Sequence, residues 1–358
     1  MNKIFIILIF FVVFIVLFIK LYKPFGDIPI IYDFKDYLKR SSNIRNNRFK
    51  NTSVSGKYTD LYSNRTTGKD LKPKDKFPVE SFSYVNNYKD DDVLVTWFGH
   101  STFLLQMHGL NILVDPIFSK TASPFSIGPK RFSDLPCDID DLPSIDVVVI
   151  AHDHYDHLDY KSIKELNKKT TLFVVPLGID KDLEKFGVSS DNIINMAWWE
   201  EIDIHGLTIV CTPARHYSGR FILDYGKALY SSFIFKDSYN TVFYSGDTGY
   251  GSHFKEIGSK YDIDFALLDS GQYSVKWHNS HMFPEEAVKA SIDLNSKLSM
   301  PIHWGAFVLS NHSFDDPVNR FVMKSKEDGI NYMMPKMGKT INIKDYKKYQ
   351  DEWWKDIK

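Results

Sequence analysis

Short apolar runs, each ended by turn-forming residues, recur along the chain from about residue 93. The runs at 93–99, 102–107 and 110–115 read VLVTWFG, TFLLQM and LNILVD, and His108 and Gly109 separate the last two. Runs of this length that are rich in β-branched and aromatic residues predict strands, and the short polar connection predicts a hairpin. We therefore expect the folded domain to begin with consecutive strands.

The run at 145–151, IDVVVIA, does not alternate between apolar and polar residues. A continuous β-branched run predicts a strand that is covered on both faces. The stretch at 160–169 has helical periodicity, with Ile163 and Leu166 on one face. Further strand-like runs occur at 171–176, 207–213, 231–236 and 241–246, and helix candidates at 284–294 and 316–329. Strands outnumber helices, which predicts an α/β domain with two sheets and outer helices over residues 91–358.

The N-terminal segment has a different character, because residues 4–19 contain no polar side chain. As a helix this run would be roughly 24 Å long at about 1.5 Å per residue, close to the thickness of a bilayer core. We interpret residues 1–23 as an uncleaved, single-pass membrane anchor. A cleaved signal peptide is the alternative, although no small-residue cleavage site follows. Lysines and arginines after the run favour a cytoplasmic catalytic domain, and the side of the membrane stays open.

Between the anchor and the strands the composition becomes polar. Residues 41–92 are rich in Asn, Ser, Lys, Asp and Thr and offer few side chains for a core. Such composition is typical of irregular structure. We therefore interpret residues 24–90 as a tether and irregular lead-in.

Charge and cysteine content exclude some functions. Lys and Arg total 44 against 45 Asp and Glu, which gives a net charge of -1. A chain without excess positive charge is not expected to bind nucleic acid. Cys137 and Cys211 lie far apart in sequence without metal-binding spacing, so we expect neither a disulfide framework nor a thiolate zinc site.

The strongest chemical signal directly follows the buried strand, in the sequence AHDHYDHLD. His152 and His154 are two residues apart, and Asp156 and His157 follow. On a loop this spacing lets the first pair face one point and the second pair another, so two neighbouring metal sites are expected. Imidazole and carboxylate suit borderline cations such as Zn²⁺. The alternative is a polar loop that happens to be rich in histidine, or a cluster of side chains satisfied by protein partners at the start of a helix.

Three later residues occur where further ligands would be needed. His216, Asp247 and His303 each follow the end of a separate predicted strand. Strand ends are the usual location of sites in α/β folds. Taken alone, a histidine in such a place is more often satisfied by protein partners than bound to metal. Their occurrence together after the first motif favours the ligand interpretation.

The order of these motifs resembles the metallo-β-lactamase fold superfamily. Within it, the chain is most similar to the N-acylphosphatidylethanolamine-hydrolysing phospholipase D branch, which is shared with bacterial lactonase-like relatives. The resemblance covers residues 91–309 and is carried by TWFGHSTFLLQM, LVDPIFSKTASPFSIGPKRF, LPSIDVVVIAHDHYDHLDYKSI, WWEE, TPARHYSGR, FYSGDTGY, HMFPEEAV and PIHWGAF.

This resemblance implies an αββα four-layer sandwich that holds two Zn²⁺ ions or other divalent metals. His152, His154 and His216 would hold one ion, Asp156, His157 and His303 the other, and Asp247 would bridge them. Asp115 would support a liganding histidine, with a turn carboxylate as the alternative interpretation. His281 would contact the reacting phosphate or protonate the leaving group, with a helix N-terminal role as the alternative. Asp247, His281 and Asp156 are the residues expected to act in catalysis.

The expected activity is phosphodiester hydrolysis by a metal-activated hydroxide. The expected partners are a phospholipid or another phosphodiester and the membrane. Two alternatives stay open: a lactonase or other small-metabolite metallohydrolase, and a catalytically silent, membrane-attached binding protein. Substrate and oligomeric state are not determined by the sequence.

Overall fold

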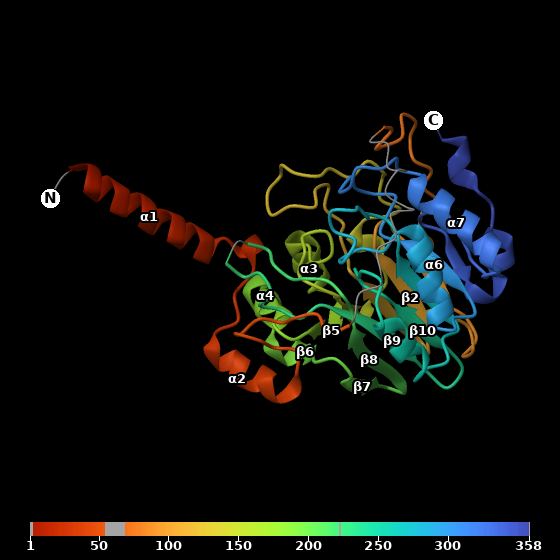
Figure 1. The fold of residues 1–358 in the computed structure, drawn as a ribbon, viewed down its shortest axis with the longest axis horizontal. Coiled ribbons are helices and arrows are strands. Elements are labelled where there is room, and N and C mark those ends of the chain that lie inside the picture. The colour runs from red at the N-terminus through yellow and green to blue at the C-terminus, as the bar shows by residue number, and fades with distance from the viewer. Residues whose placement is uncertain (1–2, 54–68, 222, 358) are drawn as a thin grey trace.

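Two β-sheets lie face to face at the centre of the molecule (Figure 1). The computed structural model describes residues 3–53, 69–221 and 223–357. Within these ranges the first sheet contains, in spatial order, β13 (Thr340–Asn342), β1 (Leu94–Trp97), β2 (Phe103–Met107), β3 (Leu110–Val114), β4 (Ile145–Val149), β5 (Thr170–Pro176) and β6 (Ile193–Met196). The second contains β12 (Ser299–Ile302), β11 (Phe265–Asp269), β10 (Thr241–Tyr244), β9 (Ser231–Lys236), β8 (Leu207–Pro213) and β7 (Glu201–Ile204).

Both sheets are mixed. Strands β3 to β6 run parallel to one another in the first sheet, as do β10 to β12 in the second. The predicted hairpin is present: β2 and β3 are antiparallel, and His108 and Gly109 form the turn with φ angles of 52° and 73°. Positive φ at both turn residues matches the twist of hairpin strands.

Helices cover the outer faces of both sheets. The helices of the described residues are α1 (Lys3–Leu21), α2 (Ile31–Arg40), α3 (Tyr160–Leu166), α4 (Ile179–Phe186), α5 (His253–Gly258), α6 (Pro284–Asp293) and α7 (Asp316–Asp328). Helices α3 and α4 pack on the first sheet, and α6 and α7 on the second. This layering confirms the predicted α/β sandwich.

Strand β4 shows why its sequence is apolar throughout. Val147 and Val149 belong to the large core that also contains inner side chains of the second sheet. Ile145 and Val148 point to the opposite face and pack with Ile163 of α3. Burial on both faces removes the polar alternation expected of a half-exposed strand.

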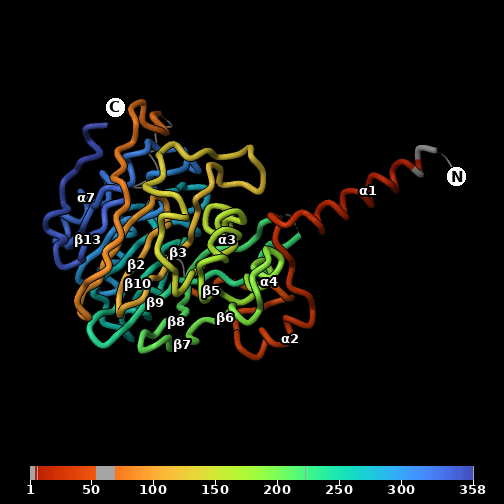
Figure 2. Tube along the Cα trace, turned by 180° about the vertical axis from the view of Figure 1, so that it is seen from behind, coloured from red at the N-terminus to blue at the C-terminus, as the bar shows by residue number. Residues whose placement is uncertain are grey.

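Helix α1 extends away from the body of the molecule in both views (Figures 1 and 2). Its apolar side chains from Ile7 to Phe18 are all exposed. Counting only the residues that the structure describes, no helix is long and apolar enough to cross a membrane. The predicted single-pass anchor therefore finds no support among them.

The segment predicted as an irregular lead-in contains helix α2. Phe34 and Tyr37 of this helix are buried together with Phe49, against Leu177 and Tyr230 of the sandwich. Part of the lead-in, residues 54–68, lies outside the described residues. The sequence did not predict this helix as part of the fold. The helix buries only a few apolar residues on one narrow face, and the segment that follows it is polar. The predicted domain limits stay a prediction.

Candidate metal centre

Loops from both sheets converge at one edge of the sandwich. The loop after β4 carries His152 to His157, and His216 follows β8. Asp247 follows β10, and His303 follows β12. Because these loops meet, residues that lie up to about half the chain apart in sequence share one buried site.

The first group that could hold a metal ion contains His152, His154, His216 and Asp247. Their nearest nitrogen and oxygen atoms all lie within 4.8 Å of one another. Nδ1 of His216 donates a hydrogen bond to the carbonyl oxygen of Ser280 at 2.9 Å. This bond leaves Nε2 of His216 facing Nδ1 of His154 at 3.2 Å. Two ring nitrogens directed at the same point are suited to share a cation.

The second group contains Asp156, His157 and His303, as expected, and also His100. Their candidate ligand atoms likewise lie within 4.8 Å of one another. Nε2 of His100 lies 2.8 Å from Oδ2 of Asp156, and the His100 and His303 rings are 4.1 Å apart. His100 reaches the site from the turn between β1 and β2, where its backbone pairs with Trp304.

Asp247 belongs to the first group and also contacts the second. Its Oδ1 is 3.0 Å from Nδ1 of His303, while its Oδ2 is 3.1 Å from Nε2 of His157 and 3.6 Å from Nε2 of His152. The preceding Gly246 has a φ of 56°, and a Cβ there would lie 2.5 Å from the carbonyl oxygen of Ser231. Glycine is therefore required at the turn that carries Asp247 into the site. This placement fits the bridging role, which stays a prediction.

Asp115 accepts hydrogen bonds from three residues at or next to the site. Its Oδ2 accepts a hydrogen bond from Nδ1 of His157 at 2.6 Å and another from the hydroxyl of Tyr244. Its Oδ1 accepts a third from the backbone nitrogen of Ala151 at 2.7 Å. The structure therefore places Asp115 against a candidate ligand, and its supporting role stays a prediction.

His281 lies beside the two groups. Its Nδ1 is 3.0 Å from Oδ2 of Asp269, a carboxylate that is fully buried at the end of β11. His281, Asp269, Asp247 and His303 form a further set of close ligand-type atoms. Burial alone would lower the pKa of His281, but the carboxylates of Asp269 and Asp247 raise it above its usual value. A histidine held this way can donate a proton.

The donor set fits divalent metal ions. His152 is buried, and neither of its ring nitrogens has a hydrogen-bond partner among the described residues. Burial and the neighbouring histidines lower the pKa of His152, His216 and His303 well below the usual value, and that of His154 falls to about 3. Neutral imidazole is the form that binds metals. Burial also raises the pKa of Asp247 to about 7, although the neighbouring His157 opposes this shift. A bound cation would favour the ionised carboxylate.

Sequence reasoning missed three residues of the site. His100 and Asp269 follow the same rule as His216 and His303, because each lies at the end of a strand. The third is Asn51, whose side chain exchanges two hydrogen bonds with the backbone of His216, at 3.0 and 3.1 Å. No local pattern marks Asn51, since its role depends on a long-range contact of the lead-in.

Comparison with known proteins identifies the family of the chain. A family model described as a beta-lactamase superfamily domain matches residues 110–304. An uncharacterised protein of Mycobacterium tuberculosis is 38% identical over 265 residues, which are 72% of this chain and 71% of that protein.

Two relatives have a named activity. The mitochondrial N-acyl-phosphatidylethanolamine-hydrolyzing phospholipase D of Saccharomyces cerevisiae is 35% identical over 68% of this chain and 55% of its own length. N-acyl-phosphatidylethanolamine-hydrolyzing phospholipase D 1 of Caenorhabditis elegans is 32% identical over 70% of this chain and 76% of its own length.

Solved structures show the same fold. A metallo hydrolase from Ignicoccus hospitalis has a TM-score of 0.54 and 26% identity, covering 70% of this chain and 98% of that one. A possible metal-dependent hydrolase from Veillonella parvula has a TM-score of 0.57 at 20% identity, covering 70% of this chain and 99% of that one, and shows the fold alone. The buried His/Asp clusters indicate a dinuclear metal site. The chain therefore belongs to the metallo-β-lactamase superfamily, as a metallohydrolase with buried His/Asp metal sites.

Proposed function

We propose that the chain is a dinuclear zinc phosphodiesterase that hydrolyses N-acylphosphatidylethanolamine or a closely similar phospholipid. The observation that carries the proposal is the pair of four-residue groups that meet at Asp247. The named activity of the yeast and nematode relatives supports the choice of substrate class.

The proposed ligand assignment follows the two groups. His152, His154 and His216 would hold one ion, Asp156, His157 and His303 would hold the other, and Asp247 would contact both. When bound, two divalent ions supply an activated water and a Lewis acid for the phosphate oxygens. His100 orients Asp156 through their 2.8 Å contact, and Asp115 fixes the ring of His157.

In the reaction, the oxygen of water joins phosphorus and the bond from phosphorus to the alcohol oxygen breaks. His281 donates the proton that the departing N-acylethanolamine oxygen needs, and phosphatidic acid is the other product. Asp269, 3.0 Å from Nδ1 of His281, holds the ring so that Nε2 is the donating atom. A proton donor at the leaving oxygen typically contributes about 10² to 10⁴ in rate.

Exposed aromatic side chains beside the site support a lipid substrate. Tyr217 is 38% exposed, and its ring lies 4.8 Å from His216 and 4.7 Å from His154. Tyr225, 5.7 Å from Tyr217, and Leu223 are also exposed. Apolar side chains around a polar centre suit a substrate with acyl chains and a charged headgroup.

Attachment to a lipid surface through α1 is a separate part of the proposal. The exposed apolar side chains from Ile7 to Phe18 form a continuous surface of the kind that marks interaction sites. Flotation of the full chain with phosphatidylcholine vesicles, compared with a chain that lacks residues 1–21, tests this part. Equal flotation of the two forms would contradict it.

Turnover assays test the central proposal. The purified full chain is incubated with N-acylphosphatidylethanolamine in mixed micelles and, separately, with a lactone panel, each with and without a chelator. We expect chelator-sensitive release of N-acylethanolamine that is lost in Asp247→Asn. Background lipid turnover together with fast lactone opening would replace the proposal with the lactonase alternative. No turnover of any substrate by metal-loaded protein would favour the silent binding protein.

A further inference from the structure

One buried arginine joins two parts of the chain that lie far apart in sequence. Arg220 is 6% exposed, and its guanidinium donates four hydrogen bonds, all of them to backbone carbonyl oxygens. Nη1 donates to Asp153 at 2.6 Å and to Leu158 at 2.8 Å. Nη2 and Nε both donate to Pro24, at 2.8 and 3.3 Å. The rigid fork of a guanidinium is suited to holding several acceptors in one fixed arrangement.

The first of the two parts is the loop after β4. Asp153 and Leu158 flank three candidate metal ligands, His154, Asp156 and His157. Nη1 of Arg220 therefore binds the backbone on both sides of these ligands. In this position the arginine can fix the loop from which the three side chains project.

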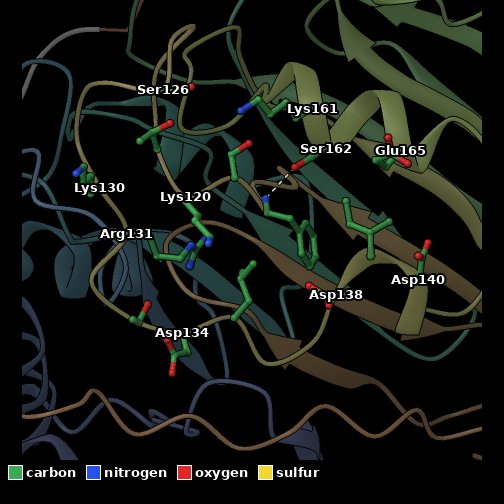
Figure 3. Close-up of a pocket in the computed structure, with 16 residues that line it drawn as sticks. Lys120, Ser126, Lys130, Arg131, Asp134, Asp138, Asp140, Lys161, Ser162 and Glu165 are labelled. Carbon is green, nitrogen blue, oxygen red and sulfur yellow. Dashed lines mark hydrogen bonds between the residues drawn. The ribbon is translucent and has the colours of Figure 1, made fainter.

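The C-terminal end of this loop has a separate anchor. Asp159 caps helix α3, because its Oδ2 accepts hydrogen bonds from the backbone nitrogen and the hydroxyl of Ser162 at 3.1 and 2.5 Å. The same hydroxyl accepts a hydrogen bond from the backbone nitrogen of Phe118 at 2.8 Å (Figure 3). These contacts hold the start of α3 without Arg220. Loss of the arginine should therefore loosen the loop and leave α3 in place.

The second part is the segment that directly follows α1. Its short 3₁₀ helix η1 (Lys23–Phe25) lies beside α4 (Figures 1 and 2). Oδ1 of Asp182 in α4 accepts a hydrogen bond from the backbone nitrogen of Asp27 at 2.8 Å. Gly26 has a φ of 75°, and a Cβ there would lie 1.8 Å from this oxygen and 3.1 Å from Cδ of Arg220. The segment therefore fits against α4 and Arg220 only with glycine at position 26.

Two buried carboxylates lie close to Arg220. Burial raises the pKa of Asp182 and of Asp224, and the positive charge of Arg220 opposes this rise in both. The backbone nitrogen of Arg220 also donates to Oδ2 of Asp224 at 2.9 Å. A buried cation needs such negative charge nearby, and hydrogen bonds from a charged donor are stronger than those from a neutral one.

We propose that Arg220 is a positioning residue that couples the segment after α1 to the ligand loop of the metal centre. By holding both, it keeps His154, Asp156 and His157 in the arrangement that metal binding requires. Displacement of residues 22–27 should loosen the loop, because Arg220 then loses two of its four acceptor contacts. The proposal rests on the metal centre and does not depend on phosphodiester hydrolysis.

Zinc affinity of the full chain, measured by competition with a chromophoric chelator, tests the positioning role. Arg220→Met keeps an unbranched side chain but removes every donor, and it should lower the affinity about 10- to 100-fold. Arg220→Lys keeps the charge and part of the donor set, so its loss should be smaller. Arg40→Met is the matched control, because Arg40 binds Asn195 and Glu200 and not the ligand loop. This control should bind zinc as the unaltered chain does.

Hydrogen exchange of residues 152–158, followed by mass spectrometry in the zinc-loaded and the metal-free full chain, tests the coupling. Gly26→Ala should displace the segment and speed exchange of the loop in both forms. Gly187→Ala is the matched control, since Gly187 has a φ of 105° but a Cβ there would meet no atom within 4 Å. It should leave exchange of the loop unchanged. Faster exchange in the metal-free form cannot result from loss of zinc.

The two measurements separate the proposal from a merely structural role. A lower melting temperature of Arg220→Met, with unchanged zinc affinity and unchanged loop exchange, would overturn the positioning role. Gly26→Ala that matches Gly187→Ala in loop exchange would overturn the coupling. Arg220→Lys and Gly26→Ala still answer if Arg220→Met fails to fold. Neither measurement uses lipid turnover, so failure of the proposed function is distinguishable from failure of this proposal.

Discussion

Nδ1 of His157 lies 2.6 Å from Oδ2 of Asp115, inside a site where both side chains are fully buried. A carboxylate at Nδ1 fixes the proton on that nitrogen, which leaves Nε2 as the atom that can bind a metal. We therefore expect Asp115 to set the orientation and the tautomer of this candidate ligand.

Asp115→Asn should lower metal affinity about 10- to 100-fold with little change of fold. Asparagine has nearly the same shape and tolerates the positive φ of 40° at this position. Competition with a chromophoric chelator measures the affinity, and circular dichroism checks the fold. Tyr244→Phe removes one hydrogen bond to Asp115 and keeps its charge, so its effect should be smaller. Unchanged affinity in Asp115→Asn would refute the supporting role.

His100 should act through Asp156. Since Nε2 of His100 lies 2.8 Å from Asp156, His100→Ala should free that carboxylate and weaken one of the two metal sites. His100→Gln keeps a hydrogen-bond donor and should restore part of the affinity. Metal content per chain and the chelator competition curve distinguish the variants. Equal loss in both would indicate that His100 binds metal directly.

Asp247→Asn should remove most activity and leave the fold largely intact. The amide offers one oxygen in place of two and no negative charge, so it would not hold both ions as the carboxylate would. We expect a rate loss of more than about a hundredfold, equivalent to about 3 kcal/mol. Initial rates at saturating substrate measure it, with thermal unfolding as the control. Full turnover in this variant would show that the bridging assignment is wrong.

Glu286 should make stability depend on pH. Burial raises the pKa of this carboxyl in helix α6 from 4.5 to about 7. Between these pH values the unfolded chain has released a proton that the folded chain retains, so stability falls as pH rises. Glutamine at this position can still accept the hydrogen bond from the backbone nitrogen of Phe283.

The advantage of Glu286→Gln in melting temperature should therefore grow from about pH 4.5 to pH 7 and then level off. Thermal unfolding across this range measures the difference. A constant difference would mean that the carboxyl titrates normally in the folded chain.

The sequence predicted the parts of the fold that local patterns determine. The hairpin turn at His108 and Gly109 and the doubly covered strand β4 were both predicted, because turn chemistry and apolar runs are local signals. The structure also brings together all seven predicted metal ligands.

Long-range contacts account for what the sequence did not predict. His100 enters the site because its turn pairs with the backbone of Trp304, about two hundred residues later. Asn51 and helix α2 pack on the sandwich although their surroundings are polar in composition. No short pattern carries such pairings, since they depend on the completed arrangement of both sheets.

Metal content tests the central claim most directly. The purified full chain is loaded with zinc and freed of loosely bound ions. Inductively coupled plasma mass spectrometry then gives the zinc concentration, which is divided by the protein concentration. The account predicts two ions per chain, falling to about one or fewer when His152 and His154 are both replaced by alanine. Well under one ion per chain in the unaltered, folded protein would contradict the dinuclear centre and the hydrolase that depends on it.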